Sequence, residues 1–467
     1  MERIAGLVRF LKGLRMSKNK ATTGINRREF IRSTAAVGAG LIFSPMVLGE
    51  TGAGGKTDDI NVAIIGVGDE GKALLDSAVK IPGLRFKAIC DIWTSWNQQN
   101  VSRYLKAYKH EHNVYVDYQE MLDKEKDLQA VIIATPDFWH SEQTVACLKK
   151  GLHVYCEKEM SNTLEGARKM VTAAKETGKL LQIGHQRRSN PRYLHCYNKL
   201  LKEAGILGRI TTINGQWNRS VSASSPRGYP KGKGIDEETL KKYGFKSMEQ
   251  FRDWRWYKGL GGGAIVDVGS HQIDIYNWFL GAVPKVVVAS GGTDYFDKKD
   301  HEWYDNVMAI YTYDTPKGVV RAYYQTITTN SCQGYFETFM GDQGTLVISE
   351  ASSRGEAYRE PTAPQWDEWV KKGYLLAPPE KKEEKSDSGA LVDVRESAAP
   401  DMYKIGAVFK DPYYKPHLEN FFDAIRGKCK LNCPAEVGYE TAATVLKVNE
   451  AVEAGCKLEF KPEEFKV

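Results

Sequence analysis

The sequence predicts an α/β protein. An N-terminal doubly wound parallel sheet of the Rossmann type precedes a C-terminal α+β domain with an open, mostly antiparallel sheet. Two observations predict the first part: apolar strand-like runs alternate with amphipathic helical segments over residues 58–183, and a glycine-rich turn directly follows the first run. From about Gly208 the pattern changes to strand-like runs separated by turns, which predicts the second sheet.

The expected domain organisation follows from these patterns. Residues 1–57 form a signal and linker, residues 58–183 a nucleotide-binding domain, and residues 184–467 a substrate-binding and oligomerisation domain. A stretch near 376–399 is rich in Pro, Glu, Lys and Ser and is expected to be a polar excursion.

Each expected element rests on its hydrophobic period. In the first domain we expect strands at 62–65, 86–90, 131–134, 153–156 and 180–183, and helices at 72–80, 141–150 and 164–177. In the second we expect strands at 210–217, 285–290, 306–313, 318–328 and 345–348, and helices at 193–204, 267–280, 417–426 and 436–454.

The glycine-rich turn carries a G-x-G-x-x-G pattern at Gly66, Gly68 and Gly71. The next apolar run ends in Asp91, 20 residues beyond Gly71. Strand, glycines, helix, second strand and acid together predict a dinucleotide site, with backbone N–H groups on the pyrophosphate and Asp91 on the adenosine ribose. The alternative is a purely structural glycine-rich turn. The intervening Val67, Asp69 and Glu70 are expected to line the same loop.

The residues around Asp91 favour NAD over NADP. A carboxylate there repels a 2′-phosphate, and Ile92 and Trp93 follow it where an arginine would accommodate that phosphate. Ile92 is therefore also a candidate cofactor contact.

The charge of the chain is unevenly distributed. Of 467 residues with a formal net charge of +6, residues 1–32 hold nine Lys or Arg and two Glu, a net charge of +7, so the remainder sums to −1. The rest of the chain therefore lacks the excess of positive charge that is typical of nucleic-acid-binding proteins. We expect no nucleic-acid partner.

The basic start contains Asn26-Arg27-Arg28-Glu29-Phe30-Ile31-Arg32, which is typical of a twin-arginine export signal. The small-residue stretch at 33–49 is too short and too rich in Gly and Ala for a firm membrane span. We expect export to the periplasm and no other membrane association. The alternative is a disordered basic tail.

Three further segments point to one family. They are Ala134-Thr135-Pro136 with His140, then Gly151-x-His153-Val154-x-x-Glu157-Lys158, and then a G-G-x-x-x-D-x-G-x-H-x-x-D segment from Gly262 to Asp274. With the later Gly341-Asp342-Gln343-Gly344-Thr345, the chain resembles the glucose–fructose oxidoreductase, inositol dehydrogenase and rhizopine-catabolism (Gfo/Idh/MocA) family over residues 60–345. The usual Glu-Lys-Pro of that family is Glu157-Lys158-Glu159 here.

The candidate catalytic residues are Lys158, Asp267 and His271. His271 is the candidate general base because its ordinary pKa lies near neutrality. Asp267 is four residues earlier, so a regular helix would place both on one face, where Asp267 could orient the ring or bind the substrate. Lys158 ends a strand, where ligands of parallel sheets bind, and can stabilise the reacting oxygen. The alternatives are a helix-surface Asp–His pair and a surface lysine.

Other candidates surround this group. Ala134, Thr135, Pro136 and His140 follow a strand end and are expected to flank the nicotinamide ribose, and the resemblance implies the same for Glu157 and Lys158. The candidate arginine for a cofactor or interdomain contact is Arg188. The candidate substrate contacts are His185, Trp254, Trp256 and Asp274; core packing is the alternative for the two tryptophans. Asp267, His271 and Asp274 could also be metal ligands, but the chemistry requires no metal and we expect none.

The resemblance implies an NAD(P)-dependent oxidoreductase that acts on a secondary alcohol of a sugar, glycoside or polyol. Outside the cytoplasm free NAD is not replenished, so we expect a tightly bound cofactor and a small carbohydrate substrate, with the C3 hydroxyl of a glycoside as a candidate reacting group. Two alternatives stay open: an NAD-dependent glycoside hydrolase that oxidises its substrate transiently, and a non-catalytic sugar sensor. By analogy with the family we expect a homo-oligomer, a dimer or tetramer.

Overall fold

The computed structural model describes residues 59–351, 353–378, 400–407 and 412–467. The expected twin-arginine signal, and residues 379–399 of the expected polar excursion, lie outside the described residues. No helix in the described part of the chain is both long enough and apolar enough to cross a membrane.

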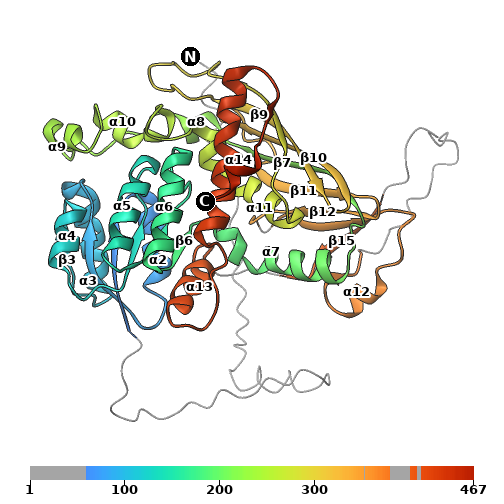
Figure 1. Ribbon diagram of the computed structural model, residues 1–467, viewed down its shortest axis with the longest axis horizontal. Helices are drawn as coiled ribbons and strands as arrows, with labels where there is room; N and C mark the ends of the chain where they lie inside the picture. Colours follow the sequence, from blue (N-terminus) through green and yellow to red (C-terminus); the bar gives the residue numbers. More distant parts are fainter. Residues whose placement is uncertain (1–58, 352, 379–399, 408–411) are drawn as a thin grey trace, which may run out of the picture. The chain divides into compact units, whose positions relative to one another are not determined.

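The first sheet has six parallel strands in the order β3-β2-β1-β4-β5-β6, as in a doubly wound Rossmann fold (Figure 1). Its strands are β1 (Ile60–Ile65), β2 (Leu84–Cys90), β3 (Asn113–Tyr115), β4 (Ala130–Ile133), β5 (His153–Cys156) and β6 (Leu181–Ile183). Its helices are α2 (Asp69–Ala78), η1 (Thr94–Gln98), α3 (Gln99–Ala107), α4 (Tyr118–Lys124), α5 (Asp137–Lys149) and α6 (Leu164–Thr177).

The continuous apolar run of β1 follows from burial on both faces of this sheet. Val62 and Ile64 pack in one core cluster, and Ala63 and Ile65 pack in another on the opposite face. Successive side chains of a strand point to opposite faces, so a strand covered by helices on both sides is apolar throughout.

The second sheet has ten strands in the order β14-β15-β13-β12-β11-β7-β10-β9-β8-β16, and only the β7–β10 pair is parallel. The predicted fold class is therefore confirmed. The strands are β7 (Ile210–Asn218), β8 (Val286–Gly292), β9 (Asn306–Thr315), β10 (Gly318–Ile327), β11 (Tyr335–Gly341), β12 (Gly344–Ile348), β13 (Gly355–Arg359), β14 (Leu375–Leu376), β15 (Asp401–Ile405) and β16 (Leu458–Glu459).

The helices that follow β6 pack on the second sheet or between the two sheets, and one of them, Lys415–Ile425, places Leu418, Phe421 and Phe422 in a core of the first sheet. These helices are η2 (Gln186–Ser189), α7 (Pro191–His195), η3 (Cys196–Glu203), η5 (Ile265–Gly269), α11 (Ser270–Leu280), α12 (Asp367–Lys371), α13 (Lys415–Ile425), α14 (Ala435–Ala454) and η6 (Pro462–Phe465). Helix α14 belongs to both cores. Tyr439 and Ala442 near its start pack in the core of the first sheet, and Val445 and Val448 pack in that of the second.

Between β7 and α11 the chain makes an excursion over residues 219–264, here called the β7–α11 segment. Its helices are α8 (Val221–Ser224), α9 (Glu237–Lys242), α10 (Met248–Arg252) and η4 (Trp254–Trp256). Leu240, Phe245 and Met248 form a small core with Trp93 of the first domain, so the segment packs against the nucleotide-binding half (Figure 1).

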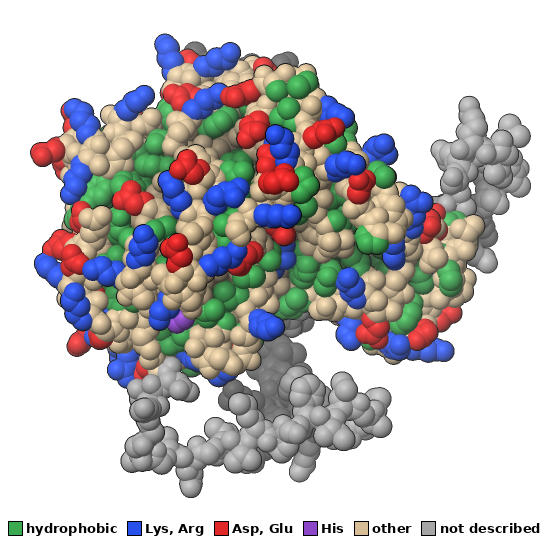
Figure 2. Space-filling model, viewed as in Figure 1, with side chains coloured by type: hydrophobic (Ala, Val, Ile, Leu, Met, Phe, Trp, Pro, Cys, Tyr) green, Lys and Arg blue, Asp and Glu red, His purple; other side chains and the backbone are tan. Residues whose placement is uncertain are grey.

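On the face drawn in Figure 2, Lys and Arg side chains are interspersed with Asp and Glu. Many of the described surface charges pair locally, such as Lys80 with Asp76 and Lys124 with Glu120, four residues apart on their helices. Positive and negative side chains are therefore mixed among the described residues of this face.

Candidate active site

The three glycines of the first turn have distinct structural roles. Gly66 has φ +83°, and a Cβ there would lie 2.6 Å from the Ala134 backbone oxygen. A Cβ on Gly71 would lie 2.1 Å from the Gly66 oxygen, so both glycines serve close backbone packing. Gly68 faces open space: the nearest atom to a Cβ there is Asn97 Nδ2, 3.9 Å away. The loop therefore leaves room for a ligand at Gly68, directly before helix α2.

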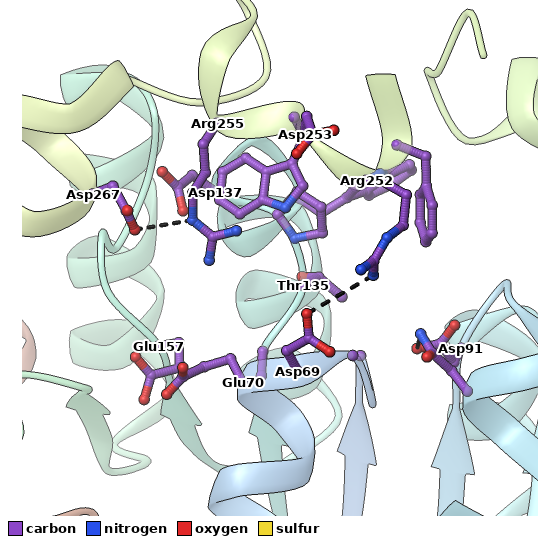
Figure 3. Close-up of a pocket in the computed structure, with 18 of the residues that line it drawn as sticks. Asp69, Glu70, Asp91, Thr135, Asp137, Glu157, Arg252, Asp253, Arg255 and Asp267 are labelled. Atoms are coloured by element: carbon purple, nitrogen blue, oxygen red, sulfur yellow. Dashed lines mark hydrogen bonds and ion pairs between the residues drawn. The ribbon is translucent and has the colours of Figure 1, made fainter. Parts of the chain in front are cut away.

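Asp91 lies at the carboxyl end of β2 and borders this space (Figure 3). Its Oδ2 accepts a hydrogen bond from Val67 N at 2.8 Å, and its Oδ1 accepts one from Trp93 N at 2.7 Å. Burial raises the pKa of this carboxyl. Oδ2 also accepts a hydrogen bond from Asn97 Nδ2 at 3.2 Å, so it is Oδ1 that keeps a lone pair for a further donor, such as a ribose hydroxyl.

Lys158 and Asp267 lie together at the other end of the site. Lys158 follows β5 at the carboxyl edge of the parallel sheet, whereas Asp267 belongs to the short π-helical turn η5 before α11. Lys158 Nζ donates to the Asp267 backbone oxygen at 2.5 Å and lies 3.5 Å from Oδ1 of the same residue.

Two arginines hold the Asp267 carboxylate, one on each oxygen. Arg255 Nε donates to Oδ1 at 2.9 Å, and Arg219 NH1 donates to Oδ2 at 3.0 Å (Figure 3 shows the Arg255 contact). Burial opposes ionisation of Asp267, but Arg255, Lys158 and Arg219 outweigh it and hold the pKa well below its usual range. The expected role of Asp267 in orienting the His271 ring is thus replaced by contacts to cations, and no hydrogen bond joins Asp267 to His271.

His271 lines the same cavity, and its ring lies 5.6 Å from that of Trp217. Neither ring nitrogen has a hydrogen-bond partner among the described residues, so both are available to a ligand. Burial, together with the charges of Lys158, Arg187 and His185, lowers the pKa of His271 well below its usual range. The ring is therefore neutral at neutral pH and able to accept a proton.

Two buried acids lie near Lys158, Asp267 and His271. Burial raises the pKa of Asp137, the first residue of α5, to about 7, although Lys158 and Arg255 oppose the shift. Burial and the neighbouring Glu70 raise the pKa of Glu157 to about 8. Both carboxyls point into the cavity (Figure 3).

One cavity of about 460 Å³ joins the two ends of the site. Its lining includes the following predicted residues: Gly66, Gly68, Asp69, Glu70, Asp91, Ile92, Ala134, Thr135, Pro136, Glu157, Lys158, Trp254, Trp256, Asp267 and His271. It also includes residues that the sequence did not single out: Asp137, Trp217, Arg227, Arg252 and Arg255. Arg219 lines it as well.

Other predicted contacts lie outside the cavity lining, for identifiable reasons. Arg188 donates to Asp274 at 2.9 Å, and both side chains are buried, so this arginine binds a carboxylate and not a cofactor. The same pairing turns Asp274 away from the expected substrate contact. His140 is buried between two backbone oxygens, those of Glu159 and Thr135.

Three further predicted residues, His185, Val67 and Gly71, also lie outside the cavity lining. His185 is buried, and neither of its ring nitrogens has a hydrogen-bond partner among the described residues. Val67 and Gly71 build the turn without bordering the cavity. Trp256 does border it, but its ring packs 4.6 Å from that of His301. In the described part of the chain, no group of three or more His, Cys, Asp or Glu side chains is arranged to hold a metal ion.

The β7–α11 segment crosses the cofactor end of the cavity. Trp93 Nε1 donates to the Lys233 oxygen at 2.5 Å, and Trp139 Nε1 donates to the Tyr243 oxygen at 3.2 Å. Asp69 of the glycine-rich turn pairs with two arginines of the segment, Arg227 at 3.3 Å and Arg252 at 3.8 Å (Figure 3 shows the latter). The segment is therefore attached at three places along this edge of the sheet.

Comparison with known proteins agrees with this architecture. A family described as an oxidoreductase family with an NAD-binding Rossmann fold matches residues 60–185, and its C-terminal alpha/beta domain matches residues 201–460. The chain is 30% identical over 235 residues to scyllo-inositol 2-dehydrogenase (NADP(+)) of Bacillus subtilis (strain 168), covering 50% of this chain and 55% of that protein. It is 27% identical over 175 residues to glycosyl hydrolase family 109 protein 1 of Shewanella sp. (strain ANA-3), covering 33% and 38%.

The chain thus spans about half or less of the length of these relatives. Among solved structures, levoglucosan dehydrogenase in complex with NADH and levoglucosan has the same fold, with a TM-score of 0.63 at 18% identity, covering 86% of this chain and 99% of that one. The two domain matches together span most of the sequence. The chain belongs to the Gfo/Idh/MocA oxidoreductase family.

Proposed function

We propose that this protein oxidises a secondary alcohol of a sugar, glycoside or polyol by hydride transfer to a tightly bound NAD. One observation carries the proposal. A single cavity brings the glycine-rich turn and Asp91, at one end, together with Lys158, Asp267 and His271 at the other. The residues proposed to bind the dinucleotide and those proposed to transfer protons therefore line one cavity.

The residues present fit a dinucleotide. The open space at Gly68 admits a pyrophosphate at the N-terminus of α2, and Oδ1 of Asp91 retains acceptor capacity for a ribose hydroxyl. The carboxylate of Asp91 and the absence of an arginine directly after it favour NAD over NADP. Isothermal titration of both dinucleotides into cofactor-free protein tests this preference, and tighter binding of NADP would contradict it.

The protein's own contribution is proton transfer and charge stabilisation. When bound, the dinucleotide supplies a hydride acceptor. The neutral His271 accepts the hydroxyl proton of the substrate, and the ammonium group of Lys158 donates a hydrogen bond to the same oxygen as negative charge develops there. Asp267 keeps Lys158 and the two arginines in place through its backbone oxygen and carboxylate.

The β7–α11 segment supports a retained cofactor. It crosses the cofactor end of the cavity, and its small core with Trp93 would have to separate before a dinucleotide could leave. A retained cofactor must be regenerated in place, by a second carbonyl compound or by return of the hydride to the same substrate.

One experiment tests the function and separates it from its rivals. Protein purified without added cofactor is examined for bound nicotinamide, and its near-ultraviolet absorbance is followed as glycosides and polyols are added. A rise in reduced nicotinamide supports the proposal. Release of a chromogenic aglycone with no net reduction would favour an NAD-dependent glycoside hydrolase, and sugar binding with no spectral change in any case would favour a sensor.

We further propose export and self-association. The twin-arginine motif supports a periplasmic location, and changing Arg27 and Arg28 together to Lys should leave the protein in the cytoplasmic fraction. Apolar side chains such as Val288, Ile310 and Val319 are exposed on the second sheet, which supports a homo-oligomer through that face. A monomer by sedimentation would contradict the latter.

A further inference from the structure

Two arginines beside the catalytic residues are only partly used by the protein. Arg219 gives NH1 to Asp267 Oδ2 and Arg255 gives Nε to Asp267 Oδ1. A guanidinium has five N–H donors. Among the described residues, no acceptor is bound to the other nitrogens of either group, and both side chains line the cavity with 28% of their surface exposed.

Both guanidinium groups are held in fixed positions. Arg219 lies over the ring of Trp217, 5.3 Å from its centroid, and Arg255 lies over the ring of Trp254, 4.4 Å from its centroid. With one contact to Asp267 and one to an aromatic face, each planar group has little freedom to turn. The unused donors are therefore pre-organised in the cavity.

The local charge is positive. Three cations, Lys158, Arg219 and Arg255, surround Asp267, the one carboxylate that all three contact. Burial raises the pKa values of the nearby Asp137 and Glu157 to about 7 and about 8 and also raises that of Glu70, so these acids reduce the positive charge at neutral pH without cancelling it. A neutral sugar would leave the excess charge in a partly desolvated site.

The end of the cavity expected to bind the cofactor is separate from the end that holds Arg219 and Arg255. Figure 3 shows Arg255 and Asp267 on one side of the cavity, with Arg252 and Asp69 next to Asp91 on the other. The pyrophosphate expected at the glycine-rich turn belongs to that second side. The charge at Arg219 and Arg255 thus remains for the substrate.

We propose that the substrate carries a carboxylate, as in a hexuronic acid or glycuronide, and that Arg219 and Arg255 bind it. Arginine forks match the two oxygens of a carboxylate, and such charge-assisted pairs are about twice as strong as neutral hydrogen bonds. This inference rests on the proposed function, because it names the substrate class of the same site.

The test uses pairs of sugars that differ only at the acidic group. Methyl glycosides of glucose, galactose and mannose are compared with the matching methyl glycuronides by calorimetric titration into the protein with its cofactor bound. We expect at least one glycuronide to bind about 10-fold or more tightly than its neutral partner, and the ratio to fall as salt is raised. Sugar 6-sulfates form a third arm; tighter binding of a sulfate than of the uronate would replace carboxylate by sulfate ester as the recognised group and overturn the proposal.

Variants identify the residues. Arg219→Gln and Arg255→Gln should bring the affinity ratio of glycuronide to glycoside close to one, and Arg219→Lys should give an intermediate ratio because it keeps charge without the planar fork. Arg252→Gln is the matched control, since it removes an arginine from the cofactor side and should keep the ratio. A ratio that survives in both glutamine variants would overturn the assignment. If neither glutamine variant folds, the lysine variant and the salt dependence decide.

Failure of this inference is distinguishable from failure of the proposed function. If neutral glycosides reduce the bound cofactor and bind as tightly as their uronates, or if no member of any pair binds, the carboxylate assignment is wrong. If uronates bind with the expected preference but never change the cofactor absorbance, the substrate class stands and the redox function is wrong.

Discussion

The ammonium group of Lys158 donates a hydrogen bond to the backbone oxygen of Asp267, 2.5 Å away. This contact joins the carboxyl end of strand β5 to η5, the helical turn that holds Asp267 and precedes His271. The lysine therefore reaches the cavity already oriented, and with one hydrogen bond to the backbone oxygen and Asp267 Oδ1 3.5 Å away it retains donor capacity for a substrate oxygen.

Replacing this lysine by glutamine should slow the chemical step. Lys158→Gln removes the charge next to the reacting oxygen, and loss of one such donor typically lowers kcat by about 10²–10³-fold. Rapid mixing with a reactive sugar, followed by nicotinamide absorbance, measures the rate. Cofactor content at the wild-type level would show that the loss lies in the reaction; a wild-type rate would remove Lys158 from the mechanism.

Removing the imidazole should abolish proton acceptance while leaving binding intact. We expect His271→Ala to lower the rate of cofactor reduction by about 10²–10⁴-fold. The pKa of His271 is held well below its usual range, so the ring becomes protonated only at pH values well below about 6.5. The wild-type rate should therefore fall only in that acidic range. Calorimetric titration of the variant with sugar is the control, and equal rates in variant and wild type would remove His271 from the mechanism.

The glycines of the turn should respond differently to alanine. Gly68→Ala places its methyl group in open space, so the protein should fold normally yet bind NAD more weakly, because the methyl occupies the space left for the ligand. Gly66→Ala instead meets the Ala134 backbone at positive φ and should destabilise the fold itself. Thermal unfolding and dinucleotide titration of both variants separate the two effects. Unchanged NAD affinity in Gly68→Ala would place the pyrophosphate elsewhere.

Much of the fold could be predicted from local sequence signals. The helix expected at 164–177 has the same bounds as α6. Its start is capped by the Thr163 hydroxyl, which accepts a hydrogen bond from Gly166 N, and its end is fixed by Gly178 at φ +64°. Helix α2 begins at Asp69, three residues before the expected start, because the glycine-rich turn itself forms its first turn. The sequence patterns did not indicate strands β3, β11, β13, β14, β15 and β16.

The site could be predicted only in part. Its glycines, strand ends and Lys158 follow from position along the parallel sheet. The Asp267–His271 relationship could not be read from a spacing of four, because the chain there forms a π-helical turn and Asp267 pairs with arginines 12 and 48 residues away. The β7–α11 segment has helices of only a few residues, too short for a periodic signal.

A substitution in the small core under this segment should speed release of the cofactor. Leu240 is 3% exposed, packs with Trp93 and does not line the cavity. Leu240→Ala should weaken the attachment of the segment by up to about 2–5 kcal/mol and raise the dissociation rate of bound NAD more than about 10-fold. Leu376→Ala, at an exposed leucine of β14, is the control. Equal dissociation rates in both variants would show that the segment does not retain the cofactor.

Glu159 should make stability fall as pH rises. It replaces the proline usual in the family, and its Oε2 is buried with no hydrogen-bond partner among the described residues. Burial raises its pKa to about 8 from an ordinary 4.5, so the folded protein holds a proton that the unfolded chain loses between those values. Its contribution is present below pH 4.5 and is lost as pH rises to about 8.

Glu159→Gln cannot ionise and should flatten this dependence. The variant should match the wild-type Tm near pH 5 and exceed it near pH 8.5, where the wild-type carboxyl must ionise in a buried position or keep its proton at a cost. Calorimetric scans across this range make the comparison. A parallel pair of Tm curves would show that Glu159 does not titrate between these limits.

Helix α14 contributes its first turns to the core of the parallel sheet and its later turns to the core of the antiparallel sheet. A hinge rotation that separated the two sheets would expose buried side chains at one end of this helix or the other, so large interdomain opening is energetically unfavourable. We therefore expect small molecules to enter and leave through local displacement of α9 and α10, whose core with Trp93 is much smaller. The turnover rate would then be limited by how fast the β7–α11 segment separates from the first domain.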